Sequence, residues 1–171
     1  MYHILVISSL LLSSMLPGIV SANQADKALS LLNLPIGEQR QSTVSAAEQQ
    51  WESQAICETI RTGVGLTRRA YFLETCVFTN AAGHTLYDET LSTATYRFLE
   101  SQLVQVSYEF TQINDPEKFN RCVQQETKKL DSRQSQTDTS SKSGITVDKE
   151  FTVSVSNVEL VEQIHVLQDA P

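Results

Sequence analysis

Residues 95–110, TYRFLESQLVQVSYEF, contain two predicted strands separated by a short polar connector, residues 100–102. The second strand has an apolar side chain at every second position: Val104, Val106, Tyr108 and Phe110. This spacing is typical of a strand with one face in the core and the other in water. The two strands and their connector predict a β-hairpin, which we take as the centre of an antiparallel sheet.

Further strands are predicted on both sides of this hairpin. The segment beginning at Arg68 is rich in aromatic and branched residues up to Phe78, and residues 79–83 have the composition of a turn. Near the C-terminus, residues 151–155 alternate again. The apolar residues that follow all have even numbers: Val158, Leu160, Ile164 and Val166. This pattern predicts one or two C-terminal strands in the same sheet.

Three segments are predicted to be helical. Residues 26–33 form a short leucine-bearing stretch, and Ser45 and Glu48 have the spacing of a capping box, so a second helix is expected to start at Ser45. The third helix has Asp115 as its N-cap and Pro116 at its first position. Its apolar residues form one stripe that can pack on the hairpin: Phe119, Cys122, Val123 and Leu130.

The order of these elements predicts an α+β fold, a hairpin-based antiparallel sheet of about four to six strands with one or two helices on one face. We divide the chain as follows: residues 1–22, a cleaved signal peptide; 23–44, a helical and polar lead segment; 45–130, the core of a single domain; 131–143, a flexible polar linker or loop; and 144–171, C-terminal strands of the same domain.

The N-terminal segment predicts export. Residues 1–22 contain no Asp, Glu, Lys or Arg, and an apolar run leads to the small residues Val20-Ser21-Ala22, where cleavage is expected. The positively charged start that is usual in such segments is missing. The alternative is an uncleaved segment that tethers the protein to a membrane. We expect a periplasmic or secreted protein, and the lack of an N-x-[ST] sequon favours a bacterial origin.

The chain has three cysteines, Cys57, Cys76 and Cys122, and an exported protein meets an oxidising compartment in which thiols pair. We predict a disulfide between Cys57 and Cys76, because both lie in the early extended region, and a free thiol at Cys122 on the later helix. Sequence spacing alone leaves the other two pairings open.

The charge balance restricts the class of partner. The chain has 13 Lys and Arg against 20 Asp and Glu, a net charge of −7, which disfavours nucleic acid and anionic membranes and suits a basic protein. Its oligomeric state is not indicated. Six basic residues make a possible patch for an anion or for the partner: Arg68, Arg69, Lys118, Arg121, Lys128 and Lys129.

The sequence has none of the common phosphate-loop, nucleophile-elbow, zinc-protease, dinucleotide or calcium-loop motifs. We therefore predict no catalytic residue, no metal and no cofactor. The hypothesis that follows is a small non-enzymatic binding protein, of the inhibitor, immunity or envelope accessory type, that acts by protein-protein contact. Two alternatives are a small exported hydrolase with a site near His84 and Asp88, and a carrier of an apolar small ligand.

Overall fold

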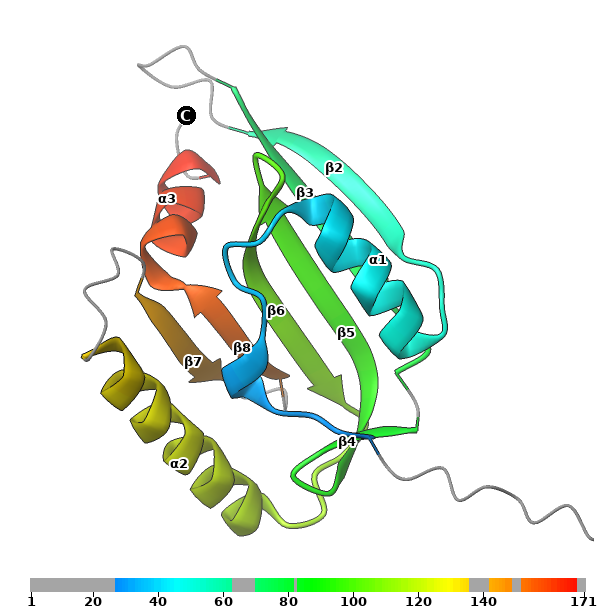
Figure 1. Cartoon of the computed structure of the whole chain (residues 1–171), viewed down its shortest axis with the longest axis vertical. Coiled ribbons are helices and arrows are strands. Elements are labelled where there is room, and N and C mark those ends of the chain that lie inside the picture. Colours follow the sequence, from blue (N-terminus) through cyan, green and yellow to red (C-terminus); the bar gives the residue numbers. More distant parts are fainter. Residues whose placement is uncertain (1–26, 63–69, 82, 136–141, 149–151, 169–171) are drawn as a thin grey trace, which may run out of the picture.

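The computed structural model describes residues 27–62, 70–81, 83–135, 142–148 and 152–168, which form an α+β fold (Figure 1). The elements in chain order are β1 (Lys27–Ala28), the 3-10 turn η1 (Leu31–Asn33), α1 (Arg40–Trp51), β2 (Ile56–Thr62), β3 (Tyr71–Phe78), β4 (His84–Leu86), β5 (Glu89–Leu99), β6 (Gln102–Phe110), α2 (Pro116–Gln134), β7 (Ser143–Val147), β8 (Thr152–Asn157) and α3 (Val158–Gln168). The predicted signal peptide, residues 1–22, lies outside these ranges.

The sheet is larger than predicted, because its described part has eight strands instead of four to six. The long strands follow the order β2-β3-β5-β6-β8-β7, and all neighbours in this order are antiparallel. The short strand β4 pairs with the first residues of β5, and β1 lies parallel to β4. Strands of two or three residues carry too little periodicity to be predicted, which explains the missing members.

The predicted hairpin is confirmed as β5 and β6. Glu100 and Ser101 connect the two strands with φ angles of 50° and 67°, the left-handed conformation that a tight two-residue hairpin turn requires. The pairing shifts between Arg97, which lies opposite Gln105, and Phe98, which lies opposite Leu103. Val104 is thus the extra residue of a bulge. Val106 belongs to the main hydrophobic core, whereas Val104 belongs to a smaller apolar cluster.

One face of the sheet carries the main core. Two rows of directly paired residues run across five strands on this face. The first row is Ile145, Val155, Val106, Tyr96 and Cys76, and the second is Val147, Val153, Tyr108, Ala94 and Phe78. Figure 1 shows α1 and the η1 segment lying across this face, and Trp51 of α1 and Phe119 of α2 are buried in the same cluster.

The opposite face is mostly polar. Its central row runs from Thr146 through Ser154, Ser107 and Thr95 to Val77, and the hydroxyls of Ser107 and Ser154 share a hydrogen bond of 2.8 Å. A small apolar cluster at one end holds α3 against the sheet; its buried members are Leu73, Leu99, Val104 and Ile164. Helices therefore lie on both faces, whereas the sequence predicted helices on one face only.

The prediction of C-terminal strands from residue 144 onward is half wrong. Strands β7 and β8 are present, but residues 158–168 form α3. Leu160 and Ile164 are four residues apart, which fits a helix face as well as alternation. The side chain of Asn157 accepts a hydrogen bond from the Leu160 amide at 3.2 Å, so Asn157 acts as an N-cap that the analysis of periodicity overlooked.

The helix boundaries also differ from the predicted ones. Helix α1 begins at Arg40, five residues before the predicted start at Ser45, and residues 27–33 hold β1 and the single turn η1 instead of a helix. Helix α2 begins as predicted, with the Asp115 side chain accepting from the Lys118 amide at 2.9 Å. It continues to Gln134, into the segment that was predicted to be a linker, where residues 136–141 lie outside the described ranges.

Candidate functional site

The predicted disulfide is present. Cys57 of β2 and Cys76 of β3 lie directly opposite one another and are bonded, and Cys122, half-buried on α2, is a free thiol. Glu74 lies close enough to both sulfur atoms that the three side chains could hold a metal ion if the cysteines were reduced. In the disulfide form the sulfur atoms are not thiolates, and Glu74 receives two hydrogen bonds from Arg40, one of them 2.7 Å long.

Strand β2 is an edge of the sheet, since β3 is its only neighbour among the described strands. The direction of its backbone groups follows from Phe72 on the neighbouring strand. The Phe72 carbonyl accepts from the Glu100 amide at 3.0 Å, and the Phe72 amide donates to the Glu100 carboxylate at 3.0 Å. Glu100 lies on the β5 side of β3, so both backbone groups of Phe72 point away from β2. Alternation in an antiparallel ladder then turns the backbone groups of the residues opposite Phe72, Glu74 and Cys76 outward. These residues are Arg61, Thr59 and Cys57.

The side chains on this edge are unusually apolar for an exposed strand. Ile56 is 67% exposed and Ile60 44% exposed, and both lie on the polar face of the sheet, four residues apart. Glu58 stands between them on the same face, and Phe72 of the neighbouring strand is 53% exposed on the other face. An open row of backbone donors and acceptors flanked by apolar side chains is a template for pairing with another extended chain.

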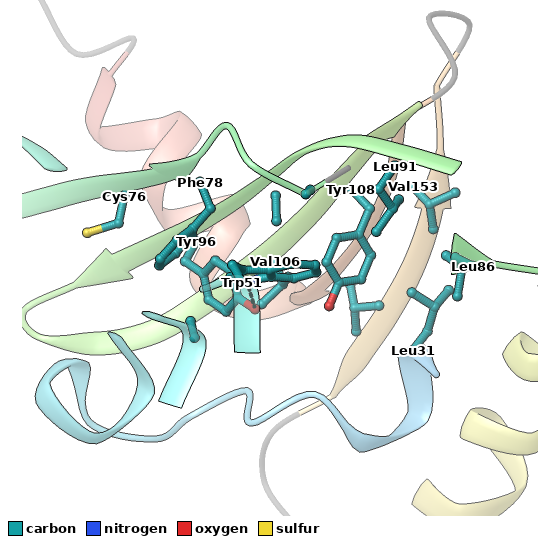
Figure 2. Packing of buried hydrophobic residues seen from close by; sticks show 14 of the residues in the cluster. Leu31, Trp51, Cys76, Phe78, Leu86, Leu91, Tyr96, Val106, Tyr108 and Val153 are labelled. Atoms are coloured by element: carbon teal, nitrogen blue, oxygen red, sulfur yellow. Dashed lines mark hydrogen bonds between the residues drawn. The ribbon is translucent and has the colours of Figure 1, made fainter. Parts of the chain in front are cut away.

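A second candidate site is a cavity of about 250 Å³ on the helix-covered face of the sheet. The η1 segment and α1 form its walls, and Tyr96 of β5 and Tyr108 of β6 line it from the sheet. Figure 2 shows these tyrosines beside Trp51, with their hydroxyls directed away from the sheet. The Trp51 indole N–H donates to the Tyr96 oxygen at 3.3 Å.

The two tyrosine hydroxyls stay protonated. Burial is the main cause that raises the pKa of Tyr96 and, more strongly, that of Tyr108. The Tyr96 oxygen accepts the hydrogen bond from Trp51, and its hydroxyl also interacts with that of Tyr108. The proton of Tyr96 remains as a donor at the cavity.

The wall formed by η1 is fixed by one carboxylate of α2. Glu126 accepts hydrogen bonds from the Tyr87 hydroxyl at 2.7 Å, from the Leu31 amide at 3.1 Å and from the Ser30 hydroxyl at 3.3 Å. Burial, together with the bond to Glu126, raises the pKa of Tyr87 far above its ordinary value, so this hydroxyl remains a donor. The η1 segment is thereby held to α2 and to the turn before β5.

The two residues of the alternative hydrolase site, His84 and Asp88, contact different groups. The His84 ring packs edge-on against Trp51 at 4.7 Å between ring centroids, whereas Asp88 is exposed in the turn before β5 and forms an ion pair with Lys118. Each residue thus interacts with a different group. His84 is the first residue of β4, and Asp88 lies in the turn between β4 and β5, where Tyr87 and Asp88 both have positive φ angles.

The predicted basic patch is only partly described. Arg68 and Arg69 lie outside the described residues, and on α2 the cations of Lys118 and Arg121 are paired with Asp88 and Glu117. The hydrogen bond that the Lys118 ammonium donates to Asp88 is the main cause that raises the pKa of Lys118. Lys128 and Lys129 are exposed farther along the helix. Of the four described cations, two are therefore paired with carboxylates of the same chain and two are exposed.

Sequence reasoning missed both the β2 edge and the tyrosine pair. A usable signal was present for the tyrosines, because Tyr96 and Tyr108 fall at inward positions of the predicted hairpin strands and a buried hydroxyl needs a polar partner. For β2, residues 56–61 fitted a helical period of four as well as alternation, so the strand itself was ambiguous.

Within the described ranges, no helix combines the length and the apolar character needed to cross a membrane. The disulfide is typical of proteins outside the reducing cytosol. Comparisons with protein-family models, with curated proteins and with solved structures gave no match.

Proposed function

We propose that this protein is exported and binds another protein, an extended segment of which adds as a further strand to the edge of β2. The observation that carries the proposal is the outward direction of the backbone groups of Cys57, Thr59 and Arg61 beside the exposed side chains of Ile56 and Ile60. Main-chain hydrogen bonds of such a complex supply affinity, and alternate side chains supply specificity.

The chemistry of the edge defines the incoming segment. Ile56 and Ile60 lie on one face, so the partner places apolar residues on that face, about 13 Å apart along the strand. Glu58 lies between them and attracts a Lys or Arg of the partner. The net charge of −7 favours a basic partner at long range as well, because it accelerates encounter at low salt.

The disulfide supports both parts of the proposal. It ties β2 to β3 directly within the edge, so the strand that carries the outward backbone groups is covalently held in the sheet. An oxidising compartment is needed to form it, which agrees with the predicted export. Export is tested by producing the full chain in a secreting bacterium: the intact mass should correspond to a chain that starts at Asn23 and has one disulfide.

The binding proposal is tested by capturing partners from the extracellular or periplasmic fraction with residues 23–171 and with two variants. Thr59→Pro removes an outward N–H without removing a hydrogen bond to β3, and Thr59→Val keeps that N–H as the matched control. We expect one protein to be retained by the unchanged chain and by Thr59→Val, and to be lost with Thr59→Pro.

The same protein retained equally by all three forms would contradict strand addition at β2. If the captured protein is this chain itself and sedimentation velocity shows a dimer, the partner at β2 is a second copy of the chain and not a different protein. Substitution of Ile56 and Ile60 by Thr tests the side-chain part separately, and we expect weaker retention with unchanged thermal stability, because both side chains are exposed.

A further inference from the structure

The cavity between η1 and α1 is independent of the β2 edge and has a distinct chemistry. Its volume of about 250 Å³ greatly exceeds the ~10–15 Å³ that one water molecule needs and falls just below the ~300–1,000 Å³ of pockets for drug-sized ligands. A molecule built on a single ring is therefore the size that it can accept.

The lining excludes a charged ligand. It consists of apolar, amide and hydroxyl side chains without any Asp, Glu, Lys, Arg or His, namely Leu29, Ser30, Asn33, Leu34, Pro35, Thr43, Ala46, Ala47, Gln50, Tyr96 and Tyr108. An ion that entered would lose hydration without gaining an opposite charge, which costs several kcal/mol. The ligand is expected to be neutral.

The Tyr96 hydroxyl is a buried donor at the cavity, and it favours a ligand that has a hydrogen-bond acceptor. The Tyr96 oxygen accepts from Trp51, so the proton of its own hydroxyl can be donated into the cavity. Two nearby hydroxyls are already used as donors, because Ser30 donates to Glu126 and Thr43 donates to the Gln39 carbonyl. A hydrogen-bond acceptor of the ligand, such as a carbonyl oxygen, therefore belongs at Tyr96.

The walls are held in place before any ligand enters. Glu126 fixes Ser30 and Leu31 at one wall, and Trp51 anchors the end of α1 to Tyr96 at the other. A preformed cavity does not spend binding free energy on ordering its walls, so even a small ligand can bind measurably.

We propose that this cavity is a binding site for a small uncharged molecule with a single-ring apolar body and a carbonyl-type acceptor, which accepts a hydrogen bond from the Tyr96 hydroxyl. The site serves as a second binding surface of the protein, on the helix-covered face of the sheet and apart from the strand edge.

The experiment uses the one tryptophan of the chain, Trp51, whose indole N–H gives a single peak in a two-dimensional proton–nitrogen NMR spectrum. The probes are acetophenone, which has a ring and a carbonyl, toluene, which lacks the acceptor, and benzoate, which is charged. We expect acetophenone to shift the indole peak saturably at millimolar concentration, with toluene about three- to tenfold weaker and benzoate without effect.

Two pairs of variants assign the shift to the cavity. Ala46→Leu places a larger side chain in the lining from an exposed helix position, and Gln49→Leu adds the same side chain at an exposed position of α1 outside the lining. Acetophenone binding should be lost in the first and kept in the second. Tyr96→Phe should weaken it about three- to tenfold, whereas Tyr71→Phe, outside the lining, should leave it unchanged.

Three results would overturn the proposal. They are no saturable shift with acetophenone, a shift that survives Ala46→Leu, and benzoate binding as tightly as acetophenone. Unchanged peaks of the remaining amides show in the same spectra that each variant is folded, so loss of binding is not confused with loss of structure. Capture of a protein partner at β2 is a separate measurement, and either result can stand without the other.

Discussion

The two faces of the sheet are built from the same strands and yet have opposite character. On the face under α1 and α2, paired rows of aromatic and branched side chains form one continuous core that includes Trp51, Phe78 and Phe119. On the other face the central row is Thr and Ser, and only one end is apolar, where α3 packs through Ile164. The difference indicates that the first face supplies most of the buried apolar contacts of the fold, while exposed apolar side chains are found at the β2 edge.

The largest expected effect is on the core face. Phe78 is fully buried there and packs edge-on against Tyr96 at 5.3 Å between ring centroids. Phe78→Ala should lower the free energy of unfolding by about 4 kcal/mol, because it removes an aromatic side chain and leaves a cavity. Chemical denaturation monitored by circular dichroism measures it, and a loss below about 1 kcal/mol would contradict the assignment of stability to this face.

The disulfide comes next. Replacing both Cys57 and Cys76 by Ser removes a covalent link between residues 19 positions apart. It should lower the free energy of unfolding by about 3 kcal/mol, because the unfolded chain gains conformational entropy. The measurement is denaturation of the double variant against the oxidised protein. The matched control is Cys122→Ser, which leaves the disulfide intact and should change the stability little, since Cys122 is free and only half-buried.

The polar face gives a smaller effect. Ile164→Ala should lower the free energy of unfolding by about 2 kcal/mol. This is at the lower end of the range for a buried isoleucine, because the cluster that contains Ile164 has only four buried members. Hydrogen exchange by mass spectrometry should also show faster exchange in α3 with little change in β5 and β6. An effect as large as that of Phe78→Ala would break the distinction between the two faces.

The smallest expected effect depends on pH and concerns the junction before α2. Burial alone raises the pKa of Glu89, but hydrogen bonds from the Asn114 amide, the Asp115 amide and the Asn114 side chain outweigh it and hold the pKa below its ordinary value. The contribution of ionised Glu89 to the free energy of unfolding is therefore fully present above the pKa of the unfolded chain, about 4.3. It is lost as the pH falls through the lower pKa of the folded state.

Glu89→Gln tests this contribution. We expect a loss of about 1.5 kcal/mol at neutral pH that shrinks toward zero in acid, as measured by denaturation at a series of pH values. Glu109→Gln, at an exposed position of β6, is the matched control and should change the stability little. A constant difference between wild type and Glu89→Gln at all pH values would show that the charge of Glu89 is not what stabilises the junction.

The elements that the sequence predicted correctly are those with a strong local signal. The hairpin of β5 and β6 has strict alternation around a polar connector, and α2 has Asp115 and Pro116 at its start. The Cys57–Cys76 pair followed from placing both residues in extended chain. Each of these predictions depends on neighbouring residues and needs no knowledge of distant contacts.

The features that were missed depend on tertiary context. Helix α1 has Gln39 at its N-cap without a side-chain hydrogen bond, so nothing local marks its start at Arg40. In α3, the even numbering of apolar residues hid a helix whose buried residue, Ile164, is selected by the cluster on the polar face. The cavity forms from η1, α1 and two central strands, and no local pattern contains all four.

The most direct test of the account is the amide hydrogen exchange of β2, measured residue by residue by NMR in the protein alone. We predict fast exchange at Cys57, Thr59 and Arg61, whose N–H groups point to the open edge, and slow exchange at Glu58 and Ile60, which bond to β3. Slow exchange at all five residues would show that the edge is already covered, and would contradict its role as the contact site.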